Sequence, residues 1–164
     1  MQPSNFNNKQ MFSRYLSSDG TTSGVKDMST TADTYYFTAT APCKIYRMIV
    51  TYTDGTGAVI SEYGNLNAAL STGIEVKLVR SGGAVLVDLT DGVPVKTNGD
   101  WIRLCYDYSF QNHGSGDDYF GVRWTFANSG KPLVLAETDR LEFIVGDDLT
   151  ELTAHYAVIQ GFYT

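Results

Sequence analysis

Acidic side chains are the groups of this chain best suited to acid–base or metal chemistry, and they gather near its end. The tract consists of Glu137, Asp139, Glu142, Asp147, Asp148 and Glu151. A calcium loop needs a spacing such as D-x-D-x-D-G, which the tract lacks, and the distance between two glycosidase carboxylates cannot be read from a sequence. We interpret these acids as solvated strand ends and a helix cap, and we predict no metal site.

The two histidines, His113 and His155, lack the neighbours of a general base. His113 lies in a glycine-rich segment with Asp117 and Asp118, which we interpret as a surface loop; a metal or ligand loop is the alternative. His155 shares a strand face with Ala157, where a hydrogen-bonded structural histidine is expected. No nucleophile elbow, phosphate loop, dinucleotide fingerprint or H-E-x-x-H motif occurs. The sequence therefore predicts no enzyme, no catalytic residue and no cofactor.

Charge and cysteine usage narrow the class of protein. The formal net charge is −6 and Lys and Arg are scattered singly, so nucleic acid is not an expected partner. Cys43 and Cys105 lack CxxC spacing, and no signal region follows Met1. This predicts reduced thiols in a protein made in a cytoplasm, with a disulfide as the alternative. No stretch is long and apolar enough to span a bilayer, so no membrane partner is expected.

The elements that position these groups fall into two unlike parts. Residues 1–33 are rich in Ser, Thr, Asn and Gly and too poor in apolar residues to build a core of their own. We predict an extended N-terminal arm that lies outside the core and is ordered only by a neighbouring surface; a floppy tail is the alternative. The side chains expected to contact that surface are Phe6, Phe12, Tyr15 and Leu16.

Residues 34–164 read as a body of successive strands separated by Gly, Asp and Asn turns. Phe120, Val122 and Trp124 alternate with polar or small residues in the clearest period-two pattern of the chain. A strand is also expected over residues 101–106, and short helical turns are expected at 65–70 and from Asp148. Eight or nine strands with short turns predict an all-β fold, a single jelly-roll β-sandwich over residues 34–164.

The last predicted strand, residues 153–163, is apolar on both faces. Such a strand is either central in a two-layer body or covered by a partner subunit, and the second option predicts a homo-oligomer. The side chains expected at the subunit contact are Tyr156, Val158, Ile159 and Phe162.

Aromatic residues elsewhere in the body suit core and interface packing, with a sugar-stacking platform as the alternative. They are Tyr35, Tyr36, Tyr106, Tyr108, Tyr119, Trp101 and Trp124.

Four stretches of the body resemble a known family. They are YFTATAPCKIY at 36–46, DLTDGVPVKTNGDW at 88–101, GDDL at 146–149 and IQGF at 159–162. In these the body resembles the jelly-roll decoration, or cement, proteins attached to the outside of tailed-bacteriophage capsids. The match covers residues 34–164 and not the arm, and no family site residue transfers to a position here because such proteins work through surfaces.

The resemblance implies a non-enzymatic virion structural protein that binds the outer capsid surface and stabilises it by bridging capsomers. It implies the major capsid protein as partner, a trimer as the oligomer, and synthesis in the cytoplasm of a bacterial host. Two alternatives stay open. One is a receptor- or glycan-binding virion module, such as a fibre head or lectin-like domain. The other is a hydrolase that uses the acidic strand ends, with Asp147 or Asp148 essential for activity.

Overall fold

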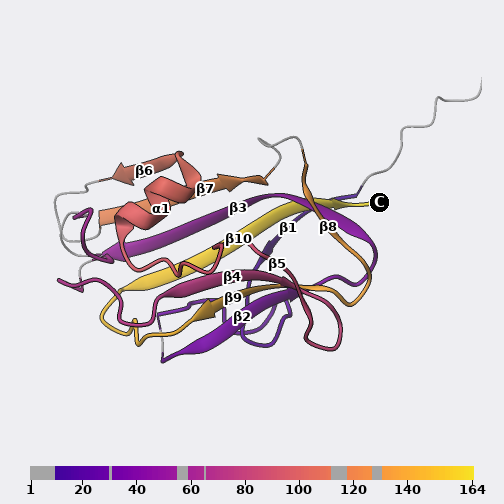
Figure 1. Cartoon of the computed structure of the whole chain (residues 1–164), viewed down its shortest axis with the longest axis horizontal. Coiled ribbons are helices and arrows are strands. Elements are labelled where there is room, and N and C mark those ends of the chain that lie inside the picture. Colours follow the sequence, from indigo (N-terminus) through magenta and orange to yellow (C-terminus); the bar gives the residue numbers. More distant parts are fainter. Residues whose placement is uncertain (1–9, 30, 55–58, 65, 112–117, 127–130) are drawn as a thin grey trace, which may run out of the picture.

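Two antiparallel sheets form the protein, which confirms the prediction of an all-β fold (Figure 1). The computed structural model describes residues 10–29, 31–54, 59–64, 66–111, 118–126 and 131–164. The first sheet, sheet A, runs in the order β1 (Met11–Tyr15), β10 (Ala154–Tyr163), β3 (Cys43–Asp54), β7 (Asp118–Thr125) and β6 (Tyr108–Gln111), and β8 (Leu133–Leu135) also pairs with β3. The second, sheet B, runs in the order β2 (Asp33–Thr38), β9 (Arg140–Val145), β4 (Ile74–Val79) and β5 (Val85–Asp88).

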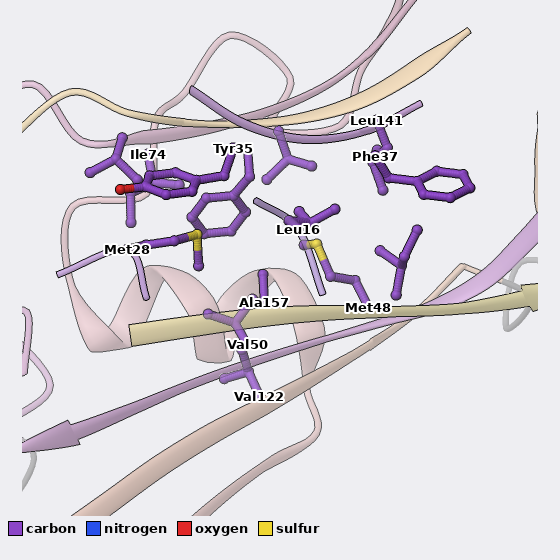
Figure 2. Packing of buried hydrophobic residues seen from close by; sticks show 14 of the residues in the cluster. Leu16, Met28, Tyr35, Phe37, Met48, Val50, Ile74, Val122, Leu141 and Ala157 are labelled. Atoms are coloured by element: carbon purple, nitrogen blue, oxygen red, sulfur yellow. The ribbon is translucent and has the colours of Figure 1, made fainter. Parts of the chain in front are cut away.

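The core lies between the two sheets, because alternate residues of each strand point inward. In β9, for example, Leu141, Phe143 and Val145 are buried while the residues between them are partly exposed. Figure 2 shows side chains of both sheets meeting in this layer, among them Tyr35 of sheet B and Val50 of sheet A. The predicted alternation in β7 is confirmed in the same way.

Residues 98–105 form the helix α1 (Asn98–Cys105), which corrects the prediction of a strand over 101–106. Thr97 accepts a hydrogen bond from the Asp100 backbone N–H, and the Asp100 carboxylate accepts from the Thr97 N–H, so the two residues form a capping box. Tyr106 ends the helix in a left-handed conformation, with φ of 54°. The alternation of Ile102 and Leu104 is typical of a strand, but the capping box of Thr97 and Asp100 stabilises a helix here.

Neither short helical turn predicted elsewhere is found among the described residues. Residues 66–70 and 148–153 form bends and turns, and residue 65 lies outside the described part of the chain. In the second segment the Asp148 carboxylate accepts the Thr150 N–H, which stabilises a turn instead of a helix.

The described part of the N-terminal segment, residues 10–29 and 31–33, belongs to the sandwich, which corrects the predicted arm over these residues and the predicted domain boundary at residue 33. Strand β1 pairs along its whole length with the C-terminal half of β10. Phe12 and Leu16 are buried between the sheets, as is Met28 in the segment that follows (Figure 2). An edge strand directs only every other side chain to the core, so a segment with few apolar residues still contributes to it.

A glycine in β10 lets β1 dock. A Cβ atom at Gly161 would lie 2.4 Å from the Lys44 carbonyl oxygen and 2.7 Å from the ring of Phe12, so only glycine fits there. The ring of Phe12 lies over this position and stacks on Phe37 of sheet B, with 5.4 Å between ring centroids. The first and last strands of sheet A are thereby joined to both layers.

Candidate functional site

The carboxylates of the acidic tract hold turns together. The Asp147 carboxylate accepts the backbone N–H groups of Ser71, Thr72 and Gly73 at 2.6 to 3.1 Å, and so fixes the turn before β4. Asp139 is buried and accepts the N–H of Ala136. Each of these acids therefore has a structural partner that explains it, and neither is poised for acid–base chemistry.

Replacing Asp147 by alanine is expected to lower the stability of the fold. Three backbone donors would lose a charged acceptor, which is expected to cost about 1.5 to 3 kcal/mol of unfolding free energy. Chemical denaturation measures this loss, and Asp148→Ala is the matched control because Asp148 is exposed and accepts only from Thr150 among the bonds described. Equal losses in the two variants would contradict the assignment.

His155 is a structural histidine, as predicted. Its ring is fully buried, and its Nε2 lies 2.5 Å from the hydroxyl of Tyr63, which also accepts a hydrogen bond from the indole N–H of Trp101 at 3.3 Å. The ring of Tyr52 stacks on it at 5.5 Å, and the Tyr52 hydroxyl bonds to Asn98. This buried polar cluster connects sheet A, the 60s segment and α1.

Burial sets the protonation of this cluster. It lowers the pKa of His155 to about 3, although the nearby Asp27 acts in the opposite direction, and it raises the pKa of the Tyr63 hydroxyl. His155 is therefore neutral at physiological pH. Because solvent and substrates cannot reach the buried ring, we assign His155 a structural role.

Cys43 and Cys105 are free thiols. Burial raises the pKa of Cys43 to about 11 and that of Cys105 to about 12, so neither is a reactive thiolate at neutral pH. Within the described ranges no three His, Cys, Asp or Glu side chains come together as a metal site. His113 and Asp117 of the predicted surface loop lie outside those ranges, and so does Phe6 of the predicted capsid contact.

The remaining predicted site residues divide between the core and the outer face of sheet A. Phe12, Leu16 and Ile159 are buried between the sheets, so the prediction that they contact a partner is wrong. The other four predicted contact residues have the opposite orientation, because they alternate with these along β1 and β10. They are Tyr15, Tyr156, Val158 and Phe162.

These four residues and Met11 lie on the outer face of the two paired strands, here called the β1–β10 face, in which the polar pair Ser13 and Gln160 separates Met11 and Phe162 from the other three. Met11 pairs with Phe162 and Tyr15 pairs with Val158 across the two strands. The ring of Tyr15 meets that of Tyr156 edge-on, with 6.1 Å between centroids, and Met11 and Tyr15 are 60% and 42% exposed. Side chains predicted to serve two different contacts, capsid and subunit, thus lie side by side.

Charge adjoins the β1–β10 face at its Tyr15 end. The ammonium group of Lys26 lies 4.9 Å from the centroid of the Tyr15 ring, within cation–π range. Burial raises the pKa of Tyr156, and the nearby Asp27, Tyr15 and Tyr119 raise it further. The phenol of Tyr156 therefore stays a neutral donor at physiological pH.

Farther along the same sheet, a hollow opens over Gly121 of β7. It has a volume of about 250 Å³, and the outward side chains around it belong to Ile49, Thr51, Ser109, Tyr119 and Arg123. This hollow was not predicted from the sequence. The signal that could have indicated it is Gly121 itself, because a glycine in the interior of a strand often marks a close approach or a gap.

The two tryptophans pack in the core, as predicted, and do not form the alternative sugar-stacking platform. Trp101 is fully buried and stacks on Phe143, while Trp124 packs against it edge-on at 6.2 Å and so faces the core, as the alternation in β7 predicted. Tyr108 likewise stacks on Phe120 of the inner layer. Of the candidate stacking residues, Tyr108 and Tyr119 both line the hollow, and Tyr119 is the one on the outward side of its strand, in line with Gly121.

No family model, curated protein or solved structure matches this chain. Its one described helix, α1, is too short to cross a membrane. The functional argument therefore rests on the geometry of the molecule itself.

Proposed function

We propose that this chain is a non-enzymatic virion structural protein that binds the outside of a phage capsid and stabilises it, with the β1–β10 face as its attachment surface. The observation that carries the proposal is this face: Met11, Tyr15, Tyr156, Val158 and Phe162 on two paired strands. Apolar and aromatic side chains that gather on the outer face of a folded domain, here on both sides of the polar pair Ser13 and Gln160, favour a contact with another macromolecule.

The strand pairing supports a jelly roll. Apart from β6 and β8, eight strands remain, and they pair first with last, second with seventh, third with sixth and fourth with fifth. This is the pairing of one long hairpin, four strands against four, rolled up so that β10 also meets β3 and β9 meets β4. Jelly rolls recur in viral capsid and lectin domains, which is consistent with a virion protein.

The state of the polar groups supports the non-enzymatic part of the proposal. Among the described residues, Asp147 and Asp139 serve backbone turns, and His155 is sealed in the core. The net charge of −6 gives no attraction to packaged DNA, so the outer surface of the shell is the expected location.

The β1–β10 face is tested by making it charged. In Val158→Asp a carboxylate would have to lose its hydration at the contact. We therefore expect the affinity for capsids from which this protein is absent to weaken at least about 30-fold. Co-sedimentation of purified protein with such capsids measures this. Ile144→Asp is the matched control, because Ile144 is a partly exposed strand residue on the outer face of sheet B.

Either of two results would contradict the proposal. One is wild-type protein that does not bind the capsids; the other is equal binding by the two variants. Light scattering of the wild type adds the oligomeric state: we expect a trimer, with three times the chain mass of 18.0 kDa. A monomer would favour a contact in which each chain binds the shell separately.

A further inference from the structure

The hollow over Gly121 has hydroxyl groups on two opposite sides. A Cβ atom added at Gly121 would lie 3.4 Å from the Ser109 hydroxyl oxygen on β6 and 3.8 Å from that of Thr51 on β3. Both side chains come from residues paired directly with Gly121, so the sheet itself fixes their positions. Each hydroxyl can donate one hydrogen bond and accept others.

One end of the hollow carries a charge pair that is neutral as a whole. The guanidinium of Arg123 lies 3.4 Å from the carboxylate of Asp107, and both side chains are about half exposed. That contact joins one nitrogen to one oxygen, whereas a guanidinium has five N–H donors and a carboxylate two oxygens. Donors and acceptors therefore stand together at this end, and neither an anion nor a cation is favoured.

The other walls are apolar. Ile49 lies beside Arg123 in the next strand, and Tyr119, two residues before Gly121, is 41% exposed. An aromatic ring with a polar tip suits a ligand that has both an apolar face and hydroxyl groups. The volume, about 250 Å³, lies below the roughly 300 to 1,000 Å³ of pockets that enclose drug-sized ligands.

We infer that this hollow is a binding site for one neutral pyranose unit of a glycan. The apolar C–H face of the sugar packs on Tyr119 and Ile49, and its hydroxyls bond to Ser109 and Thr51 in the middle of the hollow. A pair of neighbouring sugar hydroxyls meets Asp107 as acceptor and Arg123 as donor. The ligand is neutral because an ion of either sign would be repelled by one member of the Arg123–Asp107 pair.

This site goes beyond the proposed attachment to a capsid and does not depend on it. The hollow lies over β3, β7 and β6 and the attachment surface on β1 and β10, and the two adjoin, because Val158 pairs with Ile49 and Tyr156 with Thr51. A virus particle that carries the protein would then be able to bind a glycan at the part of sheet A formed by β3, β7 and β6. The two proposals fail separately, because capsid binding is measured without glycan and glycoside binding is measured without capsids.

Titration of labelled full-length protein with four probes tests the site by NMR. The probes are the methyl glycosides of glucose, galactose, mannose and N-acetylglucosamine. One stacked ring and a few hydrogen bonds predict a Kd on the order of 1 mM for at least one probe. The amide resonances of Gly121, Ser109 and Thr51 are expected to shift, while that of Ile144 on sheet B stays in place.

Gly121→Val is the sharpest variant, because it fills the hollow with a side chain that favours strands. The backbone of Gly121 leaves ordinary contact distances for a Cβ, so the variant is expected to fold and to bind the responding glycoside at least about tenfold more weakly. Arg123→Met is a second, exposed change that removes the donors without filling the space, and the same loss is expected from it.

Three results would overturn the inference. The first is that none of the four glycosides shifts the amides around Gly121. The second is that Gly121→Val, or Arg123→Met if the first variant does not fold, binds as tightly as the wild type. The third is that inorganic phosphate shifts these amides and the glycosides do not, which would make the site an anion site at Arg123.

Discussion

A chain that begins at residue 34 is expected to be unfolded. It lacks β1, and with it the buried side chains of Phe12, Leu16 and Met28. Removing large apolar side chains from a core costs about 2 to 5 kcal/mol each, so the three together approach or exceed the roughly 5 to 15 kcal/mol that stabilises an ordinary domain. Sheet B would also lose Phe12 as a partner of Phe37. Circular dichroism and a proton–nitrogen NMR spectrum of residues 34–164 measure the result.

A chain that begins at residue 10 is the matched control. It keeps β1 and the Gln10 carbonyl, which accepts the Tyr163 N–H at 3.1 Å, and it is expected to retain the fold. At the level of single residues, Leu16→Ala is expected to cost about 2 to 5 kcal/mol, and Tyr15→Ala, on the outer face, much less. A cooperative, native-like melt of residues 34–164 would show instead that the N-terminal segment is dispensable.

Stability is expected to fall steeply as the pH drops below 6.5, because His155 is buried in its neutral form. In the unfolded chain His155 takes up a proton near its ordinary pKa of 6.5, whereas in the folded chain it does so only near 3. Between these values the unfolded state binds more protons, so protonation favours unfolding. At pH 4.5 the expected loss from this group is about 2 to 3 kcal/mol relative to pH 7.5.

The difference between wild type and His155→Gln isolates this effect from that of the carboxylates. The variant is expected to be less stable at pH 7.5, because it loses the ring that stacks on Tyr52. The glutamine amide can accept a hydrogen bond from the Tyr63 hydroxyl but does not titrate, so the variant is expected to lose less unfolding free energy between pH 7.5 and 4.5. Urea denaturation across this pH range measures both. His113→Gln, which changes the chain's other histidine, is the control. Parallel pH profiles of wild type and His155→Gln would contradict the assignment.

Local patterns in the sequence predicted most strands of the body, but they assigned α1 as a strand, missed β1 and predicted two helical turns that the described residues do not form. The alternation of β7 and β9 was sufficient because one face of each is buried. The alternation of Ile102 and Leu104 was misleading, since the capping box of Thr97 and Asp100 decides the conformation there. Strand β1 was missed because its stability comes from pairing with β10, at the far end of the chain, and not from its own composition.

The candidate site could be predicted only in part. The outward residues Tyr156 and Val158 follow from the two-residue period of β10, but period alone does not bring Tyr15 beside them. The same holds for the hollow: Gly121 is visible in the sequence, yet Thr51 and Ser109 reach it only through the register of three strands. Surfaces assembled from distant strands depend on tertiary pairing, which composition does not encode.

The position of β10 also determines the order in which the fold can be completed. It lies between β1 and β3 in sheet A, yet it is the last of the described strands to leave the ribosome. Until it arrives, β1 has no partner in the sheet, and the inward side chains of β3 and β2 lack part of their cover. Because its contacts span almost the whole sequence, sheet A closes late and slowly during synthesis, and the nascent chain exposes strand edges until it does.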